Sequence, residues 1–114
     1  MILAALAMAI CLPGPRDNCV VDGDTFWTDG EKVRIADIDA PEIEGKCAFE
    51  RDLALEARNR LAELLGEAFS LRRQGKDRYG RTLVIVTVNG ASAGQVLVAE
   101  GLARRWTGRR EAWC

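Results

Sequence analysis

The chain has 114 residues, of which 48% are hydrophobic, a net charge of −1 and no histidine. This length is typical of a single domain with a modest core. Without imidazole, the sequence excludes Ser-His-Asp and Cys-His catalysis as well as histidine-based zinc sites. Acid–base chemistry would fall to Glu, Asp, Lys, Tyr or Cys, and oxygen ligands would favour a hard cation such as calcium or magnesium.

The charges are distributed unevenly along the chain. Residues 22–44 contain eight acidic and two basic side chains, whereas residues 70–114 contain nine basic and three acidic ones. This asymmetry indicates one part that holds a cation and another that holds an anion. Ordinary surface charge is the alternative interpretation of the same distribution.

The N-terminal segment favours export. Residues 2–12 are an unbroken apolar run that is too short to span a bilayer. The run resembles the hydrophobic part of a signal peptide with an A-x-A at residues 7–9, although a basic start is missing. A first buried strand or helix is the alternative. We therefore expect a signal-like extension at 1–17, a domain at 18–114, and a secreted or periplasmic protein.

The four cysteines form no C-x-x-C pair, which disfavours a zinc ribbon or a thioredoxin motif. Four widely spaced cysteines in a small domain are typical of two disulfides and of an oxidising compartment. Three pairings are possible.

The first half of the chain predicts strands. Residues 18–28 have the pattern of one strand, bent at Gly23, and residues 31–38 that of its return strand after a DG turn at 29–30. Pro41 ends this strand, and a loop carrying Cys47 follows. Within this region, Asp37 and Glu44 are interpreted as solvated charge.

The second half predicts two helices around a strand pair. Residues 49–65 have helical spacing, with Phe49, Leu53, Ala57 and Leu61 on one face. Residues 68–74 and 82–88 predict strands, an NG turn follows at 89–90, and a capping box at 92–95 begins a helix reaching about residue 105. The order favours an α+β, β-rich chain, a small five-stranded Greek-key barrel of the OB type with two main helices.

Three motifs occur in a specific order: VVDGDTF at 20–26, RIADIDAPE at 34–42 and DRYGR at 77–81, followed by a β-run and LVAEGLA at 97–103. Each motif is weak alone, but together they resemble the staphylococcal nuclease (thermonuclease) family over about residues 19–106. The resemblance implies a five-stranded OB barrel with helices, which agrees with the element order.

The resemblance implies an acidic metal site. Asp24 and Asp39 would ligate calcium together with the backbone carbonyl of Ala40, Glu42 would be the general base, and Asp22 would support the metal. Two carboxylates and one carbonyl leave several of the calcium positions for water and substrate. A solvated acidic turn is the alternative interpretation.

The resemblance also implies a phosphate-binding set. Arg34 and Arg81 would bind the scissile phosphate and stabilise its transition state, because a guanidinium grips two oxygens at once. Tyr79 would be a supporting residue near the substrate. On their charge alone, apart from the resemblance, Arg78 and Lys76 would bind the nucleic-acid backbone. Surface salt bridges, or solvated charge, are the alternatives for these basic residues.

The sequence departs from the family pattern in three places. Ala40 replaces the usual threonine, and the basic tail at 104–114 replaces a third helix. The base-stacking tyrosines have no clear counterpart, and Trp106 and Trp113 are the candidates. As a hypothesis, a Cys47–Cys114 disulfide pins the tail and a Cys11–Cys19 disulfide pins the N-terminal segment.

The function that the resemblance implies is an exported, calcium-dependent nuclease, a phosphodiester hydrolase acting on DNA and RNA with little sequence preference. Its products would end in 3′-phosphates, and we expect a monomer. The alternative is a non-catalytic OB-fold module that binds nucleic acid or a protein partner. The enzyme is favoured because every implied metal acid, base and phosphate arginine is present.

Overall fold

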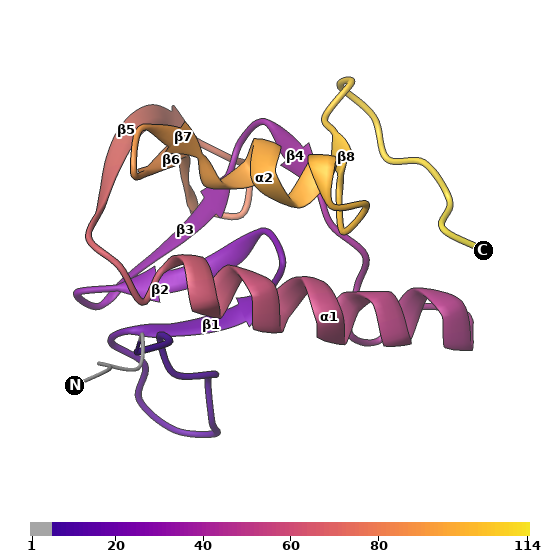
Figure 1. Ribbon diagram of the computed structural model, residues 1–114, viewed down its shortest axis with the longest axis horizontal. Coiled ribbons are helices and arrows are strands. Elements are labelled where there is room, and N and C mark those ends of the chain that lie inside the picture. Colours follow the sequence, from indigo (N-terminus) through magenta and orange to yellow (C-terminus); the bar gives the residue numbers. More distant parts are fainter. Residues whose placement is uncertain (1–5) are drawn as a thin grey trace, which may run out of the picture.

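The computed structural model describes residues 6–114, so the first five positions of the predicted export segment lie outside the described residues. A curved sheet, the helix α1 (Ala48–Leu64) and the helix α2 (Ala93–Ala99) enclose one core (Figure 1). The strands are β1 (Cys19–Asp22), β2 (Thr25–Thr28), β3 (Glu31–Ile35), β4 (Ile38–Asp39), β5 (Phe69–Lys76), β6 (Thr82–Val88), β7 (Ala91–Ser92) and β8 (Arg104–Arg105).

The strand order confirms the α+β prediction. The main sheet runs β1-β2-β3-β6-β5, with β7 beside β6, and β3 and β6 form a parallel pair among antiparallel neighbours. Five main strands in this order make the Greek-key path of an OB fold. No β1–β5 pairing closes the sheet among residues 6–114.

Both predicted two-residue turns are confirmed. Asp29 and Gly30 have φ angles of 48° and 77° between β2 and β3, and Asn89 and Gly90 have φ angles of 51° and 78° between β6 and β7. Positive φ at both central positions is the geometry that matches the twist of adjacent strands.

The prediction of a single strand at 18–28 is wrong, because Gly23 begins a turn between β1 and β2. A Cβ atom at position 23 would lie 2.8 Å from the Cβ of Ala57 and 2.9 Å from that of Ala40. The turn therefore passes directly beneath α1. As a result, Asp24 lies in the turn directly before β2 rather than in the middle of a long strand.

The residues that α1 buries differ in part from the predicted apolar face. Phe49 is 61% exposed, and the buried positions of α1 are Glu50, Ala54, Ala57, Leu61 and Ala62. Glu50 is buried because its carboxylate accepts hydrogen bonds from the backbone of the preceding loop. Small alanines let the helix approach the sheet, while Leu61 fills the core.

The second helix ends at Ala99, so the prediction that it reaches about residue 105 is wrong. The Ser92 hydroxyl accepts a hydrogen bond from the Gln95 backbone at 3.2 Å, which is half of the predicted capping box. Gly101, with a φ of 75°, turns the chain away after the last helical turn. Residues 104–105 then form β8, which pairs with β4.

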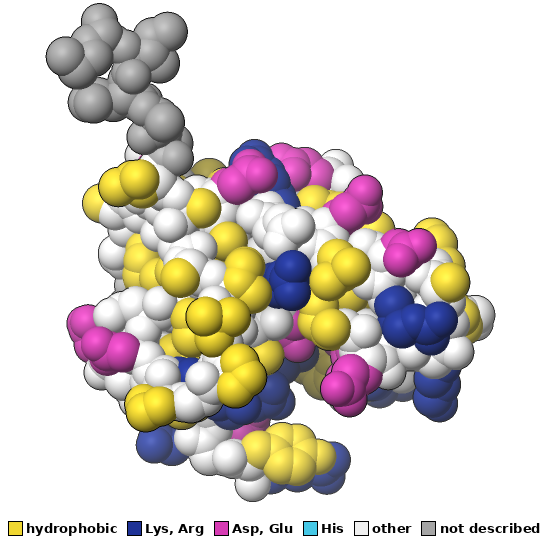
Figure 2. Space-filling view, turned by 90° about the horizontal axis from the view of Figure 1, so that it is seen from below, with side chains coloured by type: hydrophobic (Ala, Val, Ile, Leu, Met, Phe, Trp, Pro, Cys, Tyr) yellow, Lys and Arg dark blue, Asp and Glu magenta, His cyan; other side chains and the backbone are white. Residues whose placement is uncertain are grey.

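Both hypothesised disulfides are present, Cys11–Cys19 and Cys47–Cys114. They are compatible with an extracellular or periplasmic protein. Within residues 6–114, no helix combines the length and apolar character needed to cross a bilayer. Acidic, basic and hydrophobic side chains are intermixed on the face shown in Figure 2.

Candidate active site

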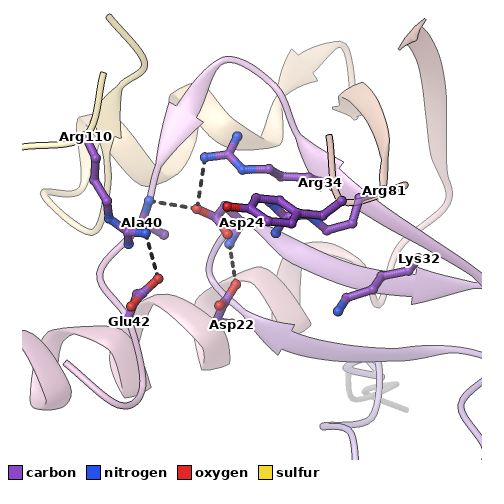
Figure 3. A pocket seen from close by; sticks show the side chains of 9 residues that line it. Asp22, Asp24, Lys32, Arg34, Ala40, Glu42, Arg81 and Arg110 are labelled. Atoms are coloured by element: carbon purple, nitrogen blue, oxygen red, sulfur yellow. Dashed lines mark hydrogen bonds and ion pairs between the residues drawn. The ribbon is translucent and has the colours of Figure 1, made fainter. Parts of the chain in front are cut away.

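A cavity of about 500 Å³ opens where the β1–β2 turn, the β3–β4 region and the tail meet (Figure 3). Its lining combines four segments of the chain. The lining residues are Asp22, Asp24, Lys32, Arg34, Ala40, Glu42, Tyr79, Arg81 and Arg110. Seven of these, all except Lys32 and Arg110, are site residues predicted from the sequence.

Asp24 lies at the centre of the cavity and is 8% exposed. Its Oδ2 accepts a hydrogen bond from the backbone of Ala40 at 3.0 Å, and its Oδ1 accepts one from the Thr25 hydroxyl at 3.0 Å. The Arg34 guanidinium is 3.6 Å away. These contacts fix the carboxylate against the loop that carries the other predicted acids.

Two further acids surround Asp24. Asp22 accepts a hydrogen bond from the Asp24 backbone at 3.2 Å, and burial, reinforced by the negative charge of Asp24, raises the pKa of Asp22 to about 8. Asp39 is 5% exposed and is not among the residues that line the cavity. Burial raises the pKa of Asp39 above its ordinary value, although Arg110 acts in the opposite direction.

The predicted donors are oxygen atoms, the ligand type that a hard cation takes. No group of three or more His, Cys, Asp or Glu side chains with metal-binding spacing occurs in the described part of the chain. The candidate set instead consists of the carboxylates of Asp24 and Asp39 and the main-chain carbonyl of Ala40. Two buried carboxylates beside Asp22, whose pKa is raised, form an environment that a divalent cation would neutralise.

Glu42 reaches the cavity from a loop that Glu50 holds in place. One Glu50 oxygen accepts a hydrogen bond from the Glu42 backbone at 3.0 Å, and the other accepts one from the Lys46 backbone at 3.3 Å. The Glu42 carboxylate itself is 51% exposed and therefore accessible to water. The sequence analysis missed Glu50, whose signal is a glutamate in the first turn of a helix that follows a loop.

The two predicted phosphate arginines line the same cavity from β3 and from the start of β6. Arg34 is 12% exposed and donates to the carbonyl of Ile35 at 2.8 Å. The Nε of Arg81 donates to Asp77 at 2.7 Å, and its Nη1 donates to the Thr25 hydroxyl at 3.4 Å. Both side chains are pre-positioned by protein partners.

Asp77 explains the DRYGR motif in physical terms. Burial alone would raise the pKa of Asp77, but hydrogen bonds from the Arg81 side chain and from the Arg81 and Tyr79 backbones outweigh it and lower the pKa. The carboxylate thus anchors both the loop and Arg81.

Of the three predicted substrate-contacting residues, Tyr79 lines the cavity of about 500 Å³, whereas Arg78 and Lys76 do not. Tyr79 is 69% exposed, and its ring lies 5.0 Å from the guanidinium of Arg78. Arg78 and Trp106 line a neighbouring cavity of about 540 Å³, whereas Lys76 lines neither cavity. Trp113 lies under Arg104, at 3.7 Å, and lines a different cavity.

Arg110, like Lys32, lines the cavity but was not predicted from the sequence. Its Nη1 lies 2.7 Å from Oε1 of Glu42, and its Nη2 lies 3.9 Å from Oδ1 of Asp39. These carboxylates outweigh partial burial and hold the pKa of Arg110 above its ordinary value. No local signal distinguishes Arg110 from the other arginines of the tail, because its position depends on contacts far away in the sequence.

Comparison with known proteins identifies the family. The model of the staphylococcal nuclease homologue family matches residues 32–112, which includes most of the cavity lining. No curated protein matches the chain. Since the matched region covers well over half of the sequence, the chain belongs to the staphylococcal nuclease homologue family.

Proposed function

We propose that the protein is a calcium-dependent nuclease that hydrolyses phosphodiester bonds in DNA and RNA with little sequence preference. The observation that carries the proposal is a single cavity containing acids on one side and Arg34 and Arg81 on the other. Phosphodiester hydrolysis needs both, since a water must be activated while an already anionic phosphorus is neutralised. Membership of the nuclease family supports the same conclusion.

Glu42 is proposed as the general base. Its exposed carboxylate faces the cavity, and the chain has no histidine to take this role. Glu42 would orient a water and accept its proton as the water oxygen bonds to phosphorus. The hydrogen bond from the Glu42 backbone to Glu50 restricts the motion of the loop. The Glu42 carboxylate therefore keeps a defined orientation.

Arg34 and Arg81 are proposed to bind the scissile phosphate. Each guanidinium offers a planar pair of donors that matches two phosphate oxygens, and each is already held by a protein partner. They would neutralise charge as the P–O5′ bond breaks, leaving a 3′-phosphate and a 5′-hydroxyl. Water would protonate the leaving oxygen, because arginine keeps its proton.

Calcium is proposed to be held by Asp24, Asp39 and the carbonyl of Ala40, with Asp22 supporting the set. When bound, calcium would supply Lewis acidity and a template for the phosphate oxygen. Tyr79 and Arg78 would contact flanking nucleotides, and Lys76 would act only through long-range charge. The two disulfides support a secreted or periplasmic location.

The experiment is cleavage of single-stranded DNA by the oxidised protein with calcium, with chelator, and with Glu42→Gln. We expect calcium-dependent cleavage that collapses in the Glu42 variant. The matched control is Glu44→Gln, two residues further along the same loop and outside the cavity of about 500 Å³. A wild type that binds DNA but cleaves nothing with any metal would establish the non-catalytic binding module instead.

A further inference from the structure

The C-terminal tail is fixed at both ends of the segment that carries Arg110. At its start, β8 pairs with β4 through Arg104 and Asp39, and the Trp106 backbone donates to the carbonyl of Asp37 at 3.0 Å. At its end, Cys114 is bonded to Cys47, directly before α1 (Figure 1). Residues 104–114 are therefore attached at both ends and cross the loop that contains Glu42. We call this segment the strap.

A third contact tightens this strap. Arg104 donates to the carbonyl of Ala112 at 3.0 Å and lies 3.7 Å from the ring of Trp113. The residues between 106 and 112 consequently form a closed loop above the cavity. Arg110 lies within this loop and extends toward the acids from the side opposite Arg34 and Arg81 in the view of Figure 3.

Arg110 lines both cavities that the two phosphate arginines line, those of about 500 Å³ and about 540 Å³. Three guanidinium groups from three separate parts of the chain thus face the same space. Such convergence is what binding of a charged phosphodiester requires.

The ion pair between Arg110 and Glu42 is weak enough for a phosphate group to replace the Glu42 carboxylate. The side chains of Arg110 and Glu42 are 52% and 51% exposed, and an ion pair between exposed side chains contributes little to stability. A phosphate offers two oxygens to the same fork. Transfer of the guanidinium from Glu42 to a phosphate would also free the Glu42 carboxylate to accept a proton.

We propose that Arg110 is a third substrate-binding arginine, supplied to the phosphate by the tail and held there by the Cys47–Cys114 disulfide. The inference rests on the proposed nuclease function and adds a residue and a cross-link to it. The substrate class is a nucleic-acid phosphodiester, and the contact is to the backbone rather than to a base.

The first measurement is binding of a labelled single-stranded oligonucleotide in chelator, followed by fluorescence anisotropy at several salt concentrations. For Arg110→Ala we expect affinity to fall about tenfold, because a charge-assisted hydrogen bond is lost at a half-exposed position. The slope of log K against log salt should also decrease by about 0.7, the value for one phosphate contact on a single strand. Arg110→Lys should restore most of the slope, but less of the affinity.

The matched control is Arg109→Ala, which removes the same charge from the adjacent exposed position without altering either cavity lining. We expect near wild-type binding. In cleavage assays with calcium, Arg110→Ala should raise KM several-fold more than it lowers kcat. Mass spectrometry and circular dichroism of each variant verify that the disulfides and fold are retained.

The second measurement removes the cross-link. The Cys47→Ser/Cys114→Ser variant should lose as much affinity as Arg110→Ala, and combining the two should add little, because both remove the same contact. Full additivity would show that the disulfide does not act through Arg110 and would overturn that half of the proposal.

The possible results separate the two proposals. Wild-type cleavage together with unchanged binding and KM in Arg110→Ala would overturn the role of Arg110 alone. Tighter binding or faster cleavage by Arg110→Ala would also overturn it, since the guanidinium would then be blocking the site. Binding without cleavage by the wild type would remove the nuclease function while the anisotropy still decides the role of Arg110, and a wild type that does neither removes both.

Discussion

The candidate site is built in two different ways on its two sides. The acidic side comes from residues 22–42, where tight turns and short strands bring the carboxylates together through backbone hydrogen bonds. The side formed by residues 104–114 has only one two-residue strand and depends on a disulfide to Cys47. Local structure positions the first part, whereas a long-range cross-link positions the second.

This difference has consequences for how each part tolerates change. A side chain held by short-range turns keeps its position as long as the domain is folded. A side chain on a strap keeps its position only while both ends of the strap are attached. Substitutions on the acidic side should therefore act on chemistry, and those on the tail should act on binding and on attachment.

The largest expected effect on activity comes from a substitution within residues 22–42. Arg34→Ala should lower kcat by about 10²–10³-fold, the usual cost of removing a donor that faces developing charge. The same assay on Arg110→Ala should show a much smaller loss in kcat. The control is Arg73→Ala, whose 2.7 Å ion pair with Glu31 is exposed and lies outside the cavity. An equal kcat loss for Arg34 and Arg110 would remove the distinction between the two parts.

The largest expected effect on stability comes from the tail cross-link. Removing Cys47–Cys114, with its separation of 67 residues, should lower the free energy of unfolding by roughly 4 kcal/mol. Removing Cys11–Cys19, with a separation of 8, should cost less, roughly 2–3 kcal/mol. Urea denaturation of both serine double variants measures the difference. A greater loss for the short loop would contradict the assumption that chain entropy dominates.

A smaller effect concerns the buried acids and depends on pH. Because burial raises the pKa of Asp22 from 3.8 to about 8, its favourable contribution is complete below about pH 4 and is lost as the pH rises toward 8. In chelator, Asp22→Asn should therefore raise the melting temperature at pH 8 and change it little at pH 4. Asp52→Asn, on the exposed side of α1, is the control. An increase in melting temperature that is the same at pH 4 and at pH 8 would contradict the raised pKa of Asp22.

The smallest expected effect concerns the orientation of Glu42. Glu50→Gln leaves only one of the two carboxylate oxygens that now accept from Glu42 and Lys46, so the loop should loosen. We expect kcat to fall several-fold with little change in KM. Glu63→Gln, an exposed glutamate paired with Arg60 on the same helix, is the comparison variant. Rescue of the Glu50 loss by Glu50→Asp would show that the charge matters more than the reach.

The part of the site formed by residues 22–42 could be predicted from the sequence because its signals are local. Asp-Gly and Asn-Gly turns, alternation along β6 and the D-A-P-E turn each depend on neighbouring residues. The motif order then pointed to the family, which the family match confirms. The turn of the β2–β3 hairpin followed from turn chemistry alone, whereas the turn at Gly23 between β1 and β2 was predicted only as a bend.

The errors share one physical cause, which is contact between distant residues. Phe49 was placed on the buried face because it is apolar, but the loop amides select Glu50 instead. Asp37 was interpreted as solvated, yet its Oδ2 accepts from Ser92 at 3.3 Å and from Gln95 at 3.0 Å. The role of Asp37 depends on residues 55 and 58 positions further along the chain, whereas the only local signal for Glu50 is its place in the first turn of the helix.

The tail was the least predictable part for the same reason. Its basic character was visible, but no periodicity indicates which of its arginines turns inward. Only the pairing of β8 with β4 and the bond to Cys47 select Arg110. A sequence pattern can thus identify a charged segment without identifying the residue that reaches the site.

The bond between Cys47 and Cys114 also has a consequence for biosynthesis. The two thiols are 67 positions apart, so the bond forms only after the whole intervening domain has been synthesised, and only where an oxidant is available. The sheet and its two helices do not depend on this bond, so the domain can fold before the tail is attached. In a reducing cytosol the tail would stay unattached, and Arg110 would lose the cross-link that holds it beside Glu42.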